Sequence, residues 1–300
     1  MSHLTCLMDT APVRLPIHFW KLVRMVGWCA ACALANLPAL AATNAFFAFD
    51  NGVGRGQWPP AQQARVLKEL GYDGIGYTGT DDLTNRFAAM QDGGLKIFSL
   101  YVRGVFDKPQ RNEPGLTNAI RLLRRSEAIL WLTVQGSKGE HDAEAAQLVR
   151  EVADLAAAGG LRVALYPHIG FYVATADDAL RVLQQVDRTN AGVTINLCHE
   201  LMAGNAARLP QIIRACAPKL FLVLINGADR ATSIEQTIKV LGEGNFDVTG
   251  FLRQLDTAGY RGPIGLQCYN LKGDPEEILR RSMAAWRSMS MKRVQPAAGR

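Results

Sequence analysis

Residues 162–197 predict a β-strand, a helix and a second β-strand, and this unit decides the fold. The first strand reads R-V-A-L-Y-P-H (162–168), the helix A-D-D-A-L-R-V-L-Q-Q-V (176–186), and the second strand G-V-T-I-N-L (192–197). Both strands are nearly continuous apolar runs, which indicates parallel strands that are buried on both faces. Polar side chains nevertheless occur at the ends of both, His168 in the first and Asn196 in the second, where burial would favour apolar residues.

The same alternation of apolar runs and amphipathic stretches fills the chain from Phe46 onward. Helical spacing of apolar residues is strongest at 142–158, and it recurs at 209–216 and 248–258. Eight such units favour an α/β fold with a single (β/α)8 TIM barrel over an open sheet. In such a barrel the active site lies at the carboxyl ends of the strands.

A nucleotide cofactor is not expected. No G-x-G-x-x-G sequence follows a predicted strand, and the G-V-G-R-G run at 52–56 lacks that spacing.

The first 41 residues have the layout of a secretory signal peptide that is cleaved. Three basic residues, the last of them Arg24, precede the apolar run 25–35, and Ala39-Leu40-Ala41 offers a cleavage site. The run is shorter than the ~20 residues needed to span a bilayer. We therefore expect a barrel domain over 42–300, a periplasmic or secreted protein, and no stable membrane span after cleavage.

Charge and cysteine content exclude two further classes. The formal net charge is +6, and cleavage would remove three basic residues and one acidic residue. No basic run remains, so nucleic-acid binding is not supported. The mature chain would keep only Cys198, Cys216 and Cys268, which is too few for a disulfide framework.

Polar residues at the predicted strand ends form the candidate site. A side-chain period of two puts Tyr166 and His168 on one face of their strand, and Gln267 and Tyr269 on one face of theirs. Any single amide among these residues could instead cap a loop or satisfy a buried backbone group. In chain order the candidates are Asp50, Tyr101, Arg103, Gln135, Tyr166, His168, Asn196, His199, Asn226, Gln267 and Tyr269.

Chemistry divides these candidates into two groups. His168 and His199 are expected to be acid or base groups because an imidazole titrates near neutral pH, while Tyr166 offers a phenolic proton and Arg103 a cation for a carbonyl or an anion. These four are the predicted catalytic residues. The predicted substrate-binding residues are Asp50, Tyr101, Gln135, Asn226 and Tyr269.

Residues 46–290 resemble a known family, most specifically in the C-terminal third of the chain. L-G-E-G-N-F-D (241–247) followed by F-L-R-Q-L-D-T-A-G-Y-R-G-P-I-G-L-Q (251–267) resembles the xylose isomerase-like TIM barrels, the sugar phosphate isomerase/epimerase group. The resemblance implies a sugar or polyol substrate, a divalent metal, and proton transfer next to a carbonyl.

The implied metal site is altered in this chain. Where the family carries Glu, D-x-x-H, His and Glu on strands five to eight, this sequence has Tyr166, Asn196 with His199, Leu224 and Gln267. Loss of every carboxylate disfavours magnesium. A zinc, manganese, cobalt or nickel ion held by His168, His199, Gln267 and Asn196 stays open.

Two hypotheses of function follow. The first is an exported isomerase- or epimerase-like enzyme that acts on a neutral sugar, keto-sugar or glycoside by proton transfer next to a carbonyl, with or without a metal. The alternative is a non-catalytic carbohydrate-binding TIM barrel that has lost the metal site. In both, the partner is a small-molecule carbohydrate.

Overall fold

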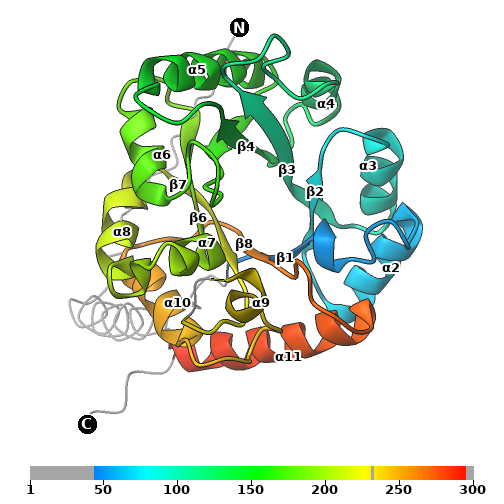
Figure 1. The fold of residues 1–300 in the computed structure, drawn as a ribbon. Coiled ribbons are helices and arrows are strands. Elements are labelled where there is room, and N and C mark those ends of the chain that lie inside the picture. The colour runs from blue at the N-terminus through cyan, green and yellow to red at the C-terminus, as the bar shows by residue number, and fades with distance from the viewer. Residues whose placement is uncertain (1–43, 231–232, 295–300) are drawn as a thin grey trace, which may run out of the picture. The chain divides into compact units, whose positions relative to one another are not determined.

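The computed structural model describes residues 44–230 and 233–294, and these form a closed barrel of eight parallel strands (Figure 1). Each strand pairs with the next in the chain, and β1 pairs with β8 to close the barrel. The predicted signal peptide lies outside the described residues. The strands are β1 Phe46–Phe49, β2 Gly74–Thr78, β3 Lys96–Val105, β4 Ile129–Gln135, β5 Arg162–Leu165, β6 Ala191–Asn196, β7 Leu220–Ile225 and β8 Ile264–Leu266.

Helices surround the barrel and cover the outer faces of its strands (Figure 1). Within the described residues no helix is both long and apolar enough to cross a membrane. The α-helices are α2 Pro60–Leu70, α3 Leu83–Asp92, α4 Leu116–Leu122, α5 Asp142–Ala158, α6 Ala176–Leu183, α7 Leu197–Met202, α8 Leu209–Cys216, α9 Ile234–Thr237, α10 Val248–Thr257 and α11 Pro275–Val294. Short 3-10 helices are η1 Asp50–Gly52, η2 Asn205–Ala207 and η3 Ala217–Lys219.

The period-two alternation of each strand sorts its side chains between two cores. In β1, Phe47 and Phe49 belong to the cluster inside the barrel, whereas Phe46 and Ala48 pack toward the helices. The same alternation in β5 places Ala164 inside the barrel. Because both faces of every strand are buried, the strands read as continuous apolar runs in the sequence.

Aromatic rings fill the barrel interior below its mouth. Phe47 stacks on Phe98 with ring centroids 5.0 Å apart, and the edge of Phe49 meets Trp131 at 5.3 Å. Gly265 of β8 faces this cluster, and a Cβ atom there would lie only 2.6 Å from the ring of Phe47. The interior is therefore a packed floor, so a ligand can enter only above it, at the carboxyl ends of the strands.

Two local features decide what reaches the mouth. Strands β3 and β4 pair as far as Val105 and Gln135, whereas pairing of β4 with β5 ends at Leu132, so β3 and β4 project beyond their neighbours. On the other side α7 begins directly after β6, with Asn196 as its N-cap residue. This helix places His199 beside the strand end.

Candidate active site

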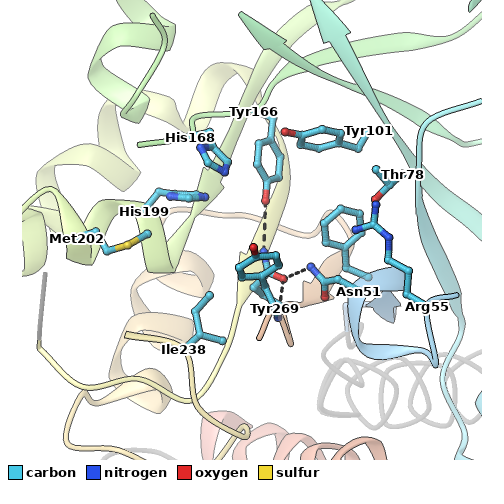
Figure 2. A pocket seen from close by; sticks show the side chains of 12 residues that line it. Asn51, Arg55, Thr78, Tyr101, Tyr166, His168, His199, Met202, Ile238 and Tyr269 are labelled. Atoms are coloured by element: carbon cyan, nitrogen blue, oxygen red, sulfur yellow. Dashed lines mark hydrogen bonds between the residues drawn. The ribbon is translucent and has the colours of Figure 1, made fainter. Parts of the chain in front are cut away.

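A cavity of about 290 Å³ opens at the carboxyl ends of the strands (Figure 2). Its walls combine aromatic rings with amide, hydroxyl and imidazole groups and one guanidinium, which is typical of a site for a small polar molecule. The lining residues are Phe49, Asn51, Arg55, Thr78, Tyr101, Tyr166, His168, His199, Met202, Ile238, Gln267 and Tyr269.

Six of the residues predicted from the strand ends line this cavity together. They come from the ends of four different strands, β3, β5, β6 and β8, so the barrel alone brings them into one place. They are Tyr101, Tyr166, His168, His199, Gln267 and Tyr269.

Tyr166 stands at the centre of the site, with its ring in the aromatic floor and its hydroxyl at the base of the cavity. The hydroxyl oxygen accepts a hydrogen bond from Asn196 Nδ2 at 2.7 Å and a longer one from Gln267 Nε2 at 3.5 Å. Burial raises the pKa of Tyr166 well above its ordinary value, so the phenol stays protonated at neutral pH. Both neighbours donate to the oxygen, which leaves the phenolic hydrogen to be donated into the cavity.

Backbone N–H groups fix the orientation of the side-chain amides of Gln267 and of its neighbour Asn51. The N–H of Tyr269 donates to Gln267 Oε1 at 3.2 Å, and the N–H of Cys268 donates to Asn51 Oδ1 at 3.2 Å. Asn51 Nδ2 in turn donates to Gln267 Oε1. Because backbone N–H groups can only donate, each amide oxygen must face them, and Gln267 must present its N–H to Tyr166.

The two imidazoles lie side by side on one wall (Figure 2), with ring centroids 4.2 Å apart. His168 Nδ1 lies 2.8 Å from the carbonyl oxygen of Ile169, so Nδ1 carries the proton and Nε2 keeps a free lone pair. His199 Nδ1 accepts from the N–H of Ile169 at 3.3 Å, so the proton of the neutral ring is on Nε2. The peptide groups of one residue thus set opposite tautomers in the two rings.

The electrostatic environment keeps both imidazoles neutral. Burial, and then the neighbouring His168, lower the pKa of His199 from 6.5 to about 3. Burial also lowers the pKa of His168. At neutral pH His168 is therefore an unprotonated base and His199 a neutral N–H donor.

A buried carboxylate holds α7, and with it His199, in place. Glu200 Oε1 accepts the N–H of Ala176 at the start of α6 at 2.7 Å, and Oε2 accepts Asn205 Nδ2 at 2.7 Å. Glu200 is fully buried, and burial raises its pKa. A negative group at the N-terminus of α6 also complements the helix dipole.

Two predicted residues, Arg103 and Gln135, do not line the cavity. Both belong to the part of β3 and β4 that projects past the neighbouring strands. Arg103 is exposed and its backbone N–H donates to Glu113, while Gln135 Nε2 donates to Thr133 Oγ1 at 3.0 Å. Sequence alone does not reveal how far a strand extends beyond its partners.

Three other predicted residues lie buried behind the cavity wall. Asp50 accepts from the N–H and Oγ1 of Thr78 at 2.9 and 2.8 Å. Asn226 Nδ2 donates to the carbonyl oxygens of Gly227 and Thr237 at 2.8 and 2.7 Å. Asn196 accepts from Cys198 Sγ through Oδ1 and donates to Tyr166 through Nδ2. Each of them supports a segment that reaches the cavity.

Several lining residues were not among the predicted site residues. Asn51 and Thr78 end their strand units and share the strand-end signal that selected the others. Arg55 lies in the glycine-rich run 52–56, whose spacing indicates only that it is not a nucleotide-binding motif. Met202 and Ile238 arrive from α7 and from the segment after α9, and nothing in their local sequence marks them.

Comparison with known proteins agrees with this architecture. The family model for the xylose isomerase-like TIM barrel matches residues 64–289. The chain therefore belongs to the xylose isomerase-like TIM barrel family.

Individual relatives are distant. A 3-dehydroshikimate dehydratase of Pseudomonas aeruginosa is 30% identical over 129 residues, 41% of this chain and 20% of that protein. The chain spans less than half the length of the curated relatives it matches. The apo form of 3-keto-D-glucoside 4-epimerase from E. coli superposes with a TM-score of 0.66 at 17% identity over 82% of this chain and 100% of that one. A protein called IOLI, with a bound zinc atom, superposes with a TM-score of 0.67. Its sequence identity is 17%, and the match covers 84% of this chain and 99% of that one.

The residues at the implied metal positions do not fit a metal ion. The Tyr166 hydroxyl lies between Asn196 and Gln267, both of which turn N–H groups toward it, and Leu224 offers no donor atom. The oxygens of those two amides are already hydrogen-bonded elsewhere. In the part of the chain that the structure describes, no three His, Cys, Asp or Glu side chains form a metal-binding group.

The low pKa of His199 predicts an acid-sensitive fold. In the unfolded chain His199 takes up a proton near its ordinary pKa of 6.5, whereas in the folded protein it does so only near 3. Between pH 6.5 and about 3 the unfolded state therefore binds more protons than the folded state. The free energy of unfolding is highest above pH 6.5 and decreases as the pH falls through this range. One such group contributes a slope of about 1.4 kcal/mol for each pH unit.

Urea unfolding at pH values from 7 to 4 measures this slope. His199→Gln keeps an acceptor for the Ile169 N–H but cannot titrate, so we expect its stability to depend less steeply on pH than that of the wild type. Equal slopes in the two proteins would contradict the assignment of the buried neutral imidazole.

Proposed function

We propose that this chain is an enzyme that moves a proton at a carbon next to the carbonyl group of a sugar. The observation that carries the proposal is the pairing of a neutral base, His168, with a neutral hydroxyl donor, Tyr166, on one cavity. Membership of the xylose isomerase-like family and the epimerase and dehydratase relatives support a carbohydrate-acting enzyme.

The proposed chemistry needs no group beyond the side chains present. Tyr166 donates its hydrogen bond to the substrate carbonyl oxygen, on which negative charge develops as the proton leaves. His168 Nε2 accepts the proton from the adjacent carbon and becomes an imidazolium. His199 Nε2–H donates to a neighbouring substrate oxygen. Delivery of a solvent proton to the opposite face of the same carbon, with the imidazolium proton released to solvent, epimerises the sugar. Transfer of the imidazolium proton to the former carbonyl carbon isomerises it, provided that the proton of the adjacent hydroxyl passes to the former carbonyl oxygen.

Loss of the phenolic hydrogen should abolish most of this activity. Incubation of wild type with keto-sugars in D₂O should exchange the hydrogen next to the carbonyl for deuterium, which NMR detects whatever the final product. Tyr166→Phe and His168→Gln should each slow the exchange by about 100-fold or more, because each removes a group that acts in the transition state.

A matched control separates chemistry from folding. Tyr72 is also buried, and its hydroxyl donates to the carbonyl oxygen of Leu279 at 2.9 Å, away from the cavity. Tyr72→Phe should lower stability by about 1 kcal/mol and leave exchange unchanged. Exchange by Tyr166→Phe at the wild-type rate would refute the proposed role of the phenol.

A non-catalytic carbohydrate-binding barrel is the second candidate. It is favoured by the mutual hydrogen bonds of Tyr166, Asn196 and Gln267, which occupy the polar groups at the implied metal positions. It predicts that sugars raise the melting temperature without deuterium exchange.

A chelator tests the metal question in both candidates. Because the donor set does not fit a metal, dialysis against EDTA should change neither the melting temperature nor the exchange rate, and elemental analysis should find less than one equivalent of zinc, manganese, cobalt or nickel. A stoichiometric metal whose removal lowers the melting temperature would show that the two imidazoles hold an ion after all.

Export to the periplasm or the medium is also part of the proposal. It is supported by the basic residues, apolar run and Ala39-Leu40-Ala41 of the N-terminal segment. Expressed from Met1 in a bacterial host, the protein should appear in the periplasmic fraction with Ala42 as its first residue by N-terminal sequencing. Ala41→Arg should block cleavage, and an unprocessed wild-type protein in the cytoplasm would contradict export.

A further inference from the structure

The loop after β1 carries one cation to the rim of the cavity. Its G-V-G-R-G sequence forms a tight turn in which Gly54 and Gly56 have φ angles of 55° and 73°, in the left-handed region that favours glycine. The first half of the turn packs closely, since a Cβ on Gly52 would lie 2.5 Å from Cys268 Cβ and one on Gly54 2.2 Å from the Trp58 ring. The loop conformation thus presents Arg55 at the cavity, beside Thr78 (Figure 2).

Arg55 is the one charged side chain at neutral pH among the described residues that line the cavity. The two lining imidazoles are neutral there because their pKa values are lowered. No hydrogen bond or ion pair joins the Arg55 guanidinium to any other described residue, although several surface arginines pair with acids, as Arg65 does with Glu69. The hydrogen-bonding capacity of Arg55 is therefore available to a ligand.

Arg55 provides a single positive charge, which the nearby Asp50 partly offsets. Asp50 lies close enough to interact with it electrostatically, but both Asp50 oxygens are taken by Thr78 and neither reaches the guanidinium as a partner. Asp50 offsets part of the positive charge from behind the wall, and no second cation lines the cavity in the described part of the chain. This arrangement suits a single negative charge better than a doubly charged phosphate.

We propose that Arg55 binds a carboxylate of the substrate, so that the enzyme acts on sugar acids rather than on neutral sugars. The inference rests on the proposed function and specifies its substrate class. Arg55 and Thr78 lie across the cavity from His199 and Met202 (Figure 2), so a substrate held by its carboxylate at Arg55 extends toward the imidazole wall. A cavity of about 290 Å³ is at the small end of ligand sites and suits a single monosaccharide unit.

Paired ligands test the inference on the full mature chain. The affinities of D-glucuronate and D-galacturonate are compared by calorimetry with those of D-glucose, D-galactose and D-glucose 6-phosphate. Wild type should bind each uronate about tenfold more tightly than its parent sugar, because a charge-assisted hydrogen bond forms only with the acid. High salt should reduce this preference because the site lies at the rim.

Variants assign the preference to the guanidinium. Arg55→Met should bind acid and parent sugar with affinities within about twofold of each other, and Arg55→Lys should retain part of the preference because lysine keeps the charge but not the planar fork. Arg65→Met, an exposed arginine outside the cavity, is the control and should keep the wild-type preference. Melting temperatures show that each variant is folded.

The possible outcomes separate this inference from the proposed function. If neutral sugars bind wild type as tightly as the acids, or if Arg55→Met keeps the preference, the carboxylate site is refuted while deuterium exchange can still establish the enzyme. Stronger binding of the 6-phosphate than of either uronate also refutes it. Absence of binding to every sugar and acid, together with absence of exchange, refutes both proposals.

Discussion

The hydroxyl of Tyr166 is the group around which the site is organised. It lies above the aromatic floor, accepts hydrogen bonds from Asn196 and Gln267, and is buried so that its pKa is well above the ordinary value. The neutral groups at the implied metal positions supply no negative charge that would compensate a cation in a low-dielectric interior. The replacements at these positions are all neutral: the Tyr166 phenol, the amides of Asn196 and Gln267, and Leu224 form one neutral layer.

The backbone fixes the polarity of this layer. N–H groups after β8 orient the amides of Asn51 and Gln267, and the two peptide groups of Ile169 assign different tautomers to His168 and His199. The groups that make these hydrogen bonds are all neutral, so the polarity of the site is the same across the pH range in which both imidazoles are neutral. Preorganised neutral dipoles of this kind stabilise charge that develops during a reaction without reorganising.

Prediction from the sequence was most accurate where a signal repeats. The strand–helix alternation gave the barrel, and the boundaries of α5 and α8 agree with the predicted spans because their apolar periodicity is strong. Strand-end polarity found six of the residues that line the cavity, since the ends of all parallel strands meet on one side of the barrel. Arg103 and Gln135 lie outside the cavity because their strands continue past the mouth, and the polar groups of Asp50 and Asn226 face neighbouring segments rather than the cavity.

The sequence by itself determined the fold class, the family and the side of the barrel on which a site must lie, because these follow from hydrophobic period and chain order. It also determined that the carboxylates of the implied metal site are missing. Only the tertiary structure decided what replaces them: that the Tyr166 hydroxyl stands between two amides, that Ile169 contacts both imidazoles, and that a glycine-rich loop brings Arg55 to the rim. These are contacts between residues as much as 101 positions apart, and their geometry depends on register and loop conformation, which local sequence patterns do not encode.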